Sequence, residues 1–117
     1  MAAQHVRMLD AQTITPNLVQ PRDRWTDLGA FRVLEVQVRV IKPGTGDNAG
    51  AVLKLQHAPV AEDDAFSDTP VSVRVDSTAP SLPVNIQVTS FSRFLRWVAG
   101  GAVAGAPVAI MDVIGKE

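Results

Sequence analysis

Strict alternation of apolar and polar residues over positions 31–41 is the feature that most constrains the fold of this chain. The even positions from 34 to 40 are all leucine or valine, and the positions between them include Glu35, Gln37 and Arg39. A period of two residues places one face of a strand on the core and the other in water, whereas a helix needs a period near 3.6. Valine also favours extended backbone. The segment is therefore predicted to be a half-buried β-strand.

The same alternation recurs between turn signals along the chain. Eight prolines and eight glycines divide the sequence into short segments, and further strands are predicted over 51–57, 71–75, 82–88 and 108–114. The glycine-rich stretch 42–50 predicts a loop, and the strands on either side of it are expected to pair as an antiparallel hairpin. Pro83 is expected at the start of its strand or on a sheet edge, because it cannot donate to a ladder.

Two segments leave alternatives open. Phe91, Phe94, Leu95 and Val98 have helical spacing, yet the segment is short and runs into Gly100, so a strand is favoured over a short helical turn. Residues 1–20 show no clean period. They are predicted to be either an arm or edge segment that docks on a neighbouring subunit, or a poorly ordered terminus with one short strand near residues 13–15.

Composition supports one all-β domain. The chain has 117 residues, of which 46% are hydrophobic, and it contains no cysteine, so a core is expected without disulfides or cysteine-based zinc. Seven or eight short strands favour an antiparallel β-sandwich, jelly-roll-like, over residues 21–117. The net charge of −1 lacks the basic excess of nucleic-acid binders. No apolar stretch reaches the ~20 residues of a membrane-spanning helix, so no membrane partner is expected.

Residue types that could support catalysis are sparse. His5 and His57 are the only histidines, and no nucleophile-elbow pattern accompanies them. The acidic segment 62–68 could offer oxygen ligands to calcium, but its spacing does not match an EF-hand loop. We therefore predict no enzyme activity, no cofactor and no metal site, with a solvated loop as the expected role of the acidic segment.

Two arginines and a tryptophan lie close together in the segment 93–97. Arg93, Arg96 and Trp97 are of the types enriched at the centres of protein interfaces, although arginines that extend along a surface strand give the same pattern. In the amino-terminal segment, Met8, Leu9 and Ile14 are the apolar side chains that an arm could bury on a neighbour. These six residues are the predicted interface, which includes self-association as a homo-oligomer.

Several stretches resemble small jelly-roll virion proteins of tailed bacteriophages, across roughly residues 22–117. In chain order, these stretches are Trp25-Thr26-Asp27-Leu28-Gly29, the strand 31–41, Leu53-Lys54-Leu55-Gln56-His57, Phe94-Leu95-Arg96-Trp97, and Ala109 to Lys116 after a glycine-rich loop. The resemblance implies a capsid decoration or cement protein on the virion surface, assembled in the host cytoplasm, with the major capsid protein as its partner. It implies no catalytic residues. Carbohydrate-binding jelly rolls, on a phage tail or fibre or in a bacterial protein, share the same strand pattern and remain the alternative.

Overall fold

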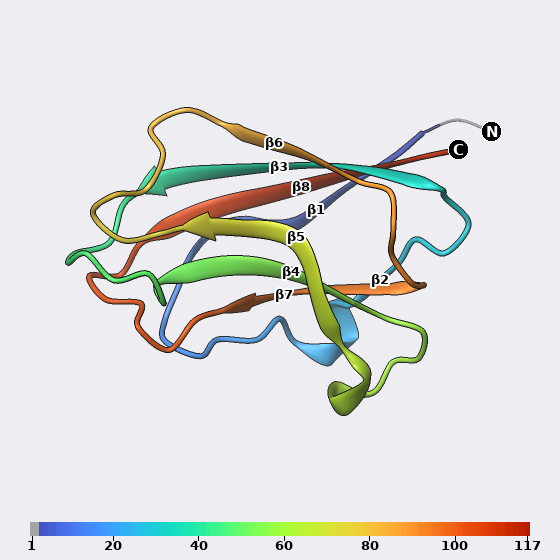
Figure 1. Ribbon diagram of the computed structural model, residues 1–117, viewed down its shortest axis with the longest axis horizontal. Helices are drawn as coiled ribbons and strands as arrows, with labels where there is room; N and C mark the ends of the chain where they lie inside the picture. The colour runs from blue at the N-terminus through green and yellow to red at the C-terminus, as the bar shows by residue number, and fades with distance from the viewer. Residues whose placement is uncertain (1–2) are drawn as a thin grey trace.

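A computed structural model describes residues 3–117, which form an antiparallel β-sandwich of eight strands in two four-stranded sheets (Figure 1). Two short 3-10 helices, η1 and η2, lie in the connections. The elements in chain order are β1 Gln4–Thr13, η1 Arg22–Arg24, β2 Thr26–Asp27, β3 Val33–Lys42, β4 Val52–Ala58, η2 Asp63–Ala65, β5 Ser67–Arg74, β6 Val84–Val88, β7 Phe94–Ala99 and β8 Val108–Lys116. The predicted all-β class and strand number are confirmed.

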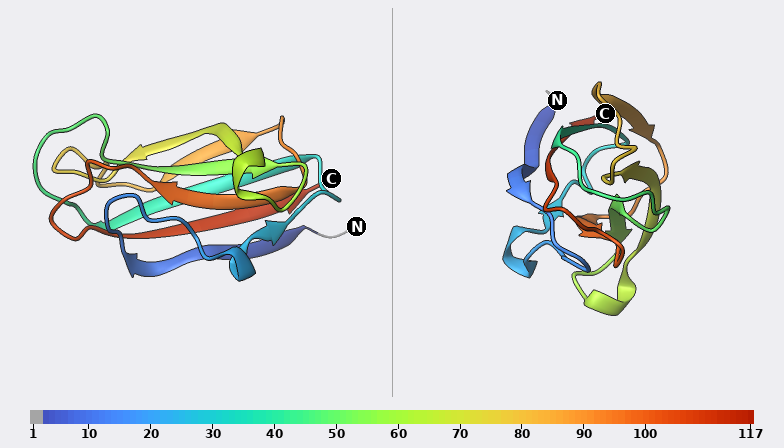
Figure 2. Two further views of the ribbon diagram at one scale, coloured as in Figure 1. Left: turned by 90° about the horizontal axis from the view of Figure 1, so that it is seen from below. Right: turned by 90° about the vertical axis from the view of Figure 1, so that its left-hand side faces the viewer.

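The strand order identifies the sandwich as a jelly roll. One sheet has the order β1-β8-β3-β6 and the other β2-β7-β4-β5. Strand β1 pairs with β8, β2 with β7, β3 with β6 and β4 with β5, all antiparallel. The chain is therefore one long hairpin, with its tip between β4 and β5, rolled so that successive pairs alternate between two facing sheets (Figure 2).

The hairpin predicted between the strands on either side of the loop 42–50 is wrong. Strand β3 pairs with β6 and β8, whereas β4 pairs with β5 and β7 in the opposite sheet. The loop crosses the sandwich, and nine residues easily span the ~10 Å between packed sheets. Alternation shows which face of a strand is buried, but it carries no information about which strand lies beside it.

Buried and exposed faces follow the alternation closely. Seven inward side chains of β3, β4 and β5 are at most 4% exposed and belong to one core cluster; they are Leu34, Val36, Val38, Leu53, Leu55, Val71 and Val73. Strand β6 begins directly after Pro83 and forms one edge of its sheet, as expected for proline. The segment 91–98 contains strand β7 and no helix, so the favoured alternative is confirmed.

The amino-terminal segment is built into the sandwich as edge strand β1. The short strand predicted near residues 13–15 is misplaced, because the observed strand runs from Gln4 and ends at Thr13. Its pairing with β8 shifts register twice, after Arg7 and after Leu9, and Ala11 adopts a left-handed φ of 46°. At these irregularities the adjacent residues Met8 and Leu9 are both buried. The apolar residues of this strand therefore do not alternate with polar ones, and the sequence shows no period of two.

A buried carboxylate fastens the two loops at one end of the sandwich. Asp76, 1% exposed, accepts the backbone N–H groups of Asn48 at 2.8 Å and Thr78 at 2.9 Å. Its side chain also accepts the Arg74 guanidinium and the Thr78 hydroxyl, both at 2.6 Å. These two side chains, Arg74 foremost, hold the pKa of Asp76 well below its ordinary value. The crossing loop after β3 is thus tied to the end of β5.

Replacing Asp76 should therefore destabilise the fold far more than replacing its exposed counterpart. Arg74 donates to both Asp76 and Asp47, but the Asp47 side chain is 80% exposed. We expect Asp76→Ala to lower the melting temperature by at least ~10 °C, because two part-buried backbone hydrogen bonds and the contacts with Arg74 and the Thr78 hydroxyl are all lost. Asp47→Ala should lower it by less than ~3 °C. Equal shifts in calorimetry would show that Asp76 does not fasten the loops.

Candidate functional site

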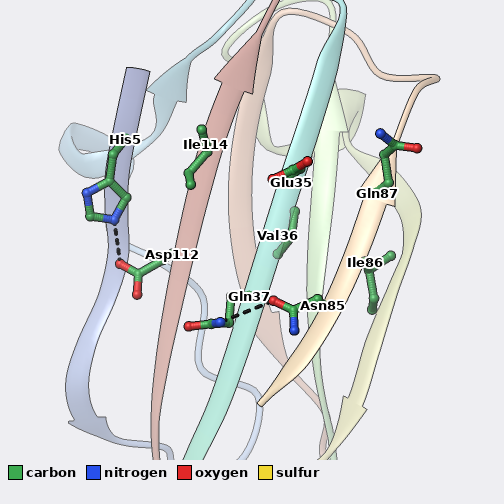
Figure 3. A pocket seen from close by; sticks show the side chains of 9 residues that line it. All are labelled: His5, Glu35, Val36, Gln37, Asn85, Ile86, Gln87, Asp112 and Ile114. Atoms are coloured by element: carbon green, nitrogen blue, oxygen red, sulfur yellow. Dashed lines mark hydrogen bonds and ion pairs between the residues drawn. The ribbon is translucent and has the colours of Figure 1, made fainter. Parts of the chain in front are cut away.

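The outer face of the β1-β8-β3-β6 sheet carries a shallow groove of about 550 Å³ (Figure 3). Its polar side chains come from all four strands, which bring together residues from both ends of the chain and from its middle. The lining residues are His5, Glu35, Val36, Gln37, Asn85, Ile86, Gln87, Asp112 and Ile114. A surface assembled in this way exists only when the whole sheet is formed.

Asp112 is the electrostatic centre of this face. It is an outward residue of β8, yet its side chain is only 12% exposed because three side chains from the flanking strands converge on it. Its Oδ1 accepts His5 Nε2 and Arg7 Nε, each at 2.9 Å. Its Oδ2 accepts Arg7 Nη2 at 3.3 Å and Arg39 Nη2 at 3.4 Å. The carboxylate thus links edge strand β1, through β8, to β3.

Opposing effects act on the pKa of Asp112. Partial burial raises the pKa, but the hydrogen bonds from Arg7 and His5 and the charge of Arg7 together outweigh burial, so the net direction is downward. The same contact raises the pKa of Arg7. Asp112 and Arg7 are therefore both charged near neutral pH. The third residue of this contact, Arg39, has a buried Nε with no hydrogen-bond partner within residues 3–117.

Isoleucines flank this charged centre along the same face. Ile110 is cross-strand to Arg39, and Ile114 is cross-strand to His5 and Glu35. Ile110 is 8% exposed, whereas Ile41, two residues after Arg39 on β3, is 57% exposed. We call this surface the arginine–isoleucine face and define it by Arg7, Arg39, Ile41, Ile110, Asp112 and Ile114. Its charged side chains pair with one another, and among its apolar side chains Ile41 is the one most open to a partner.

Part of the outer face of the opposite sheet is covered by an arginine and two aromatic rings. The Arg96 guanidinium lies 4.1 Å from the centre of the Phe66 ring and 5.2 Å from that of Trp25, and the two rings meet edge to face. Arg96 also donates to Gln56 at 3.0 Å and to Asp63 at 3.0 Å. Segments η1 and η2 are thereby packed onto one part of this sheet, and a groove of about 540 Å³ lies over another part, lined by residues that include Lys54, Ser72 and Val98.

The six residues predicted as an interface do not form one surface. Met8, Leu9 and Ile14 are core residues, at most 6% exposed. Trp97 is also in the core, 1% exposed, and its indole Nε1 donates to the Met8 carbonyl at 2.9 Å.

The two predicted arginines lie apart from that core group. Arg96 is held in the aromatic cluster with an exposed fraction of 9%. Arg93 alone is open to solvent, where it pairs with Asp27 at 2.8 Å and covers the Phe94 ring.

Groups with possible catalytic or metal-binding chemistry are engaged in structural contacts. The Ser92 backbone N–H donates to His57 Nδ1 at 2.8 Å, which fastens the segment before β7 to β4. In the acidic segment, Asp68 accepts Lys54 and Gln56. Across residues 3–117, no group of three or more histidine, cysteine, aspartate or glutamate side chains is arranged to hold a metal ion. The same part of the chain contains no helix long and apolar enough to cross a bilayer.

Sequence reasoning missed the residues that define the arginine–isoleucine face. One signal was available: Asp112 is the single charged residue in the otherwise apolar stretch 108–114. An isolated charge on a strand of this kind requires partners. The identity of those partners depends on which strands lie beside β8, and the sequence pattern does not determine that.

Comparison of the chain with protein-family models, curated proteins and solved structures finds no significant match. The strand order by itself places the described residues in the class of antiparallel jelly-roll sandwiches.

Removing the charge of Asp112 should destabilise the protein in a pH-dependent manner. Because its native pKa is lowered, Asp112 stabilises the fold above its unfolded pKa of ~3.9, and this contribution is lost as pH falls through the native value. We expect Asp112→Asn to reduce the free energy of unfolding by ~1–3 kcal/mol at pH 7. The difference from wild type should shrink below pH ~4.

A matched control is available on the same arginine. Asp10 contacts Arg7 at 3.5 Å with a side chain that is 76% exposed. Asp10→Asn should change stability by less than ~0.5 kcal/mol. Urea unfolding of both variants across pH provides the measurement, and a difference for Asp112→Asn that is independent of pH would contradict the assignment.

Proposed function

We propose that this chain is a non-catalytic structural protein of virions, a capsid decoration or cement protein that binds the major capsid protein. The observation that carries the proposal is the arginine–isoleucine face, where Ile41 is 57% exposed beside arginines held by Asp112. Arginine and exposed apolar side chains in one patch are typical of protein-binding surfaces. The resemblance to small jelly-roll virion proteins supplies the identity of the partner.

In this role the protein acts as an adhesive between capsid subunits. The Asp112 contacts hold Arg7 and Arg39 in place before binding, so less side-chain entropy is lost when the face is covered. A standard interface buries on the order of 1,600 Å² in total. Many copies on one shell multiply a modest affinity, and together they resist the outward pressure of packaged DNA.

A charge placed on the exposed isoleucine should weaken attachment strongly without unfolding the domain. We expect Ile41→Asp to weaken binding to capsids by at least ~10-fold, because a carboxylate would be buried in an apolar contact. Val60→Asp is the matched control, since Val60 is 45% exposed and lies between β4 and β5, outside the arginine–isoleucine face. Co-sedimentation with empty capsids measures attachment, and circular dichroism confirms that both variants fold. Equal binding of the two variants would contradict the proposed face.

Carbohydrate binding is the second candidate function, and the polar lining of the groove favours it. Gln37 donates to Asn85 at 3.1 Å, and this pair lies beside the Gln87 amide and the Glu35 carboxylate (Figure 3). Amides and carboxylates in such an arrangement can bind sugar hydroxyls. The residues that line the groove include no phenylalanine, tyrosine or tryptophan ring on which a sugar could stack.

A glycan array separates the two functions. We expect no glycan to bind under conditions in which capsids are bound. A hit that disappears in Asn85→Ala would replace capsid adhesion with carbohydrate binding as the function of this face.

A further inference from the structure

Strand β6 differs from the other three sheet edges because, within Val84–Val88, it contains no feature that prevents pairing with a further strand; Pro83 lies just before it. Strand β2 is two residues long, and β5 contains Pro70, which cannot donate a backbone hydrogen bond. At β1, the Met8 carbonyl accepts Gln20 Nε2 at 3.2 Å and Trp97 Nε1 at 2.9 Å, and the strand shifts register twice. These features block or interrupt the edges that they occupy.

The backbone of β6 is open on the side away from β3. Strand β3 is its one strand partner in the described chain. Outside that ladder, residues 84–88 make no backbone hydrogen bond within residues 3–117. The strand is five residues long, which is ordinary for a globular protein, and it contains no charge, proline or glycine. An uncharged edge with free backbone groups can accept another strand.

The sequence of β6 is complementary to itself. Apolar residues at 84, 86 and 88 alternate with the amides Asn85 and Gln87, so the strand has nearly the same pattern in both directions about Ile86. Antiparallel pairing with a second copy about Ile86 sets Val84 opposite Val88 and Asn85 opposite Gln87. Each contact then joins like chemistry, and the absence of charge removes the like-charge repulsion that would oppose identical strands.

We propose that β6 is the self-association site, at which two copies of this chain pair antiparallel about a two-fold axis at Ile86. The partner is a second copy because the strand is uncharged and self-complementary. The two sheets join as β1-β8-β3-β6-β6-β3-β8-β1.

Leu82, just before β6, is the most exposed large apolar side chain within residues 3–117, at 74%. Leu82 precedes Ile86 by four residues, so the two-fold carries it toward residue 90 of the second copy. In addition, an axis perpendicular to the joined sheet leaves both arginine–isoleucine faces on the same side. The dimer therefore presents two copies of the proposed capsid-binding surface together, although the pairing itself does not depend on capsid binding.

A charge-swap experiment on the purified chain tests the proposal. One variant carries Asn85→Lys and Gln87→Lys, and the other carries Asn85→Glu and Gln87→Glu. In each homodimer, like charges face each other at two places, so we expect the dissociation constant to rise at least ~10-fold over wild type. An equimolar mixture of the two variants should restore the dimer, because every pair then joins opposite charges. Sedimentation equilibrium measures the dissociation constant of the wild type, of each variant and of the mixture.

The control places the same charges on the other long, exposed edge. Ser67→Lys with Ser72→Lys on β5 adds two lysines at exposed positions and should leave the dissociation constant unchanged. Melting curves establish that all variants fold. Hydrogen exchange should show that amides of residues 84–88 gain protection as the wild-type concentration rises.

Two results would overturn the assignment. Wild-type protein that stays monomeric at millimolar concentration would exclude the dimer. A dimer that withstands both charge variants would place self-association elsewhere on the molecule. Either result leaves the capsid-binding proposal standing, because co-sedimentation of the Ile41 variant tests that proposal separately.

Discussion

Strands β1 and β8 join the two ends of the chain, and both sheet order and surface chemistry depend on this contact. The pairing sets residues 4–13 beside residues 108–116, and β8 in turn pairs with β3, so β8 is a central strand. On the inner side, Leu9 is set beside Met111 in the core. On the outer side, Arg7 is set beside Asp112. Without β1, β8 would become an edge and Asp112 would lose two of its three partners.

Hydrogen bonds close the sandwich beside β1. Gln20 is 3% exposed and bridges the two sheets, because it donates to the Met8 carbonyl of β1 and accepts the Trp97 backbone N–H of β7 at 3.3 Å. The opposite side, where β5 and β6 are the edges, has no hydrogen bond between those strands in the described chain. The molecule thus has one sealed side and one side with backbone groups free to pair. This asymmetry is the basis on which self-association is proposed at β6.

The two outer faces of the sandwich differ in how their arginine side chains are held. Trp25 and Phe66 enclose Arg96 and anchor short helical segments over one sheet, whereas the other sheet carries only its own side chains. A guanidinium between two rings satisfies its charge within the molecule. On the arginine–isoleucine face, the guanidinium groups contact Asp112, and the side chains of Arg7 and Arg39 are 42% and 35% exposed. The first arrangement stabilises the domain, and the second leaves polar groups available to a partner.

The sequence by itself determined the strands and their buried faces, because side-chain alternation is a local consequence of extended backbone. It predicted that Val36 and Val38 face the core and that β7 is a strand. Tertiary structure alone decided which strands are neighbours, and it placed β3 and β4 in opposite sheets. It also decided that β1 forms an edge strand, because the register shifts of this strand hide its periodicity. It brought Asp112 into contact with His5 and Arg7, more than 100 positions away in the chain. Pairing between distant strands depends on the packing of the whole sandwich, and no local pattern records it.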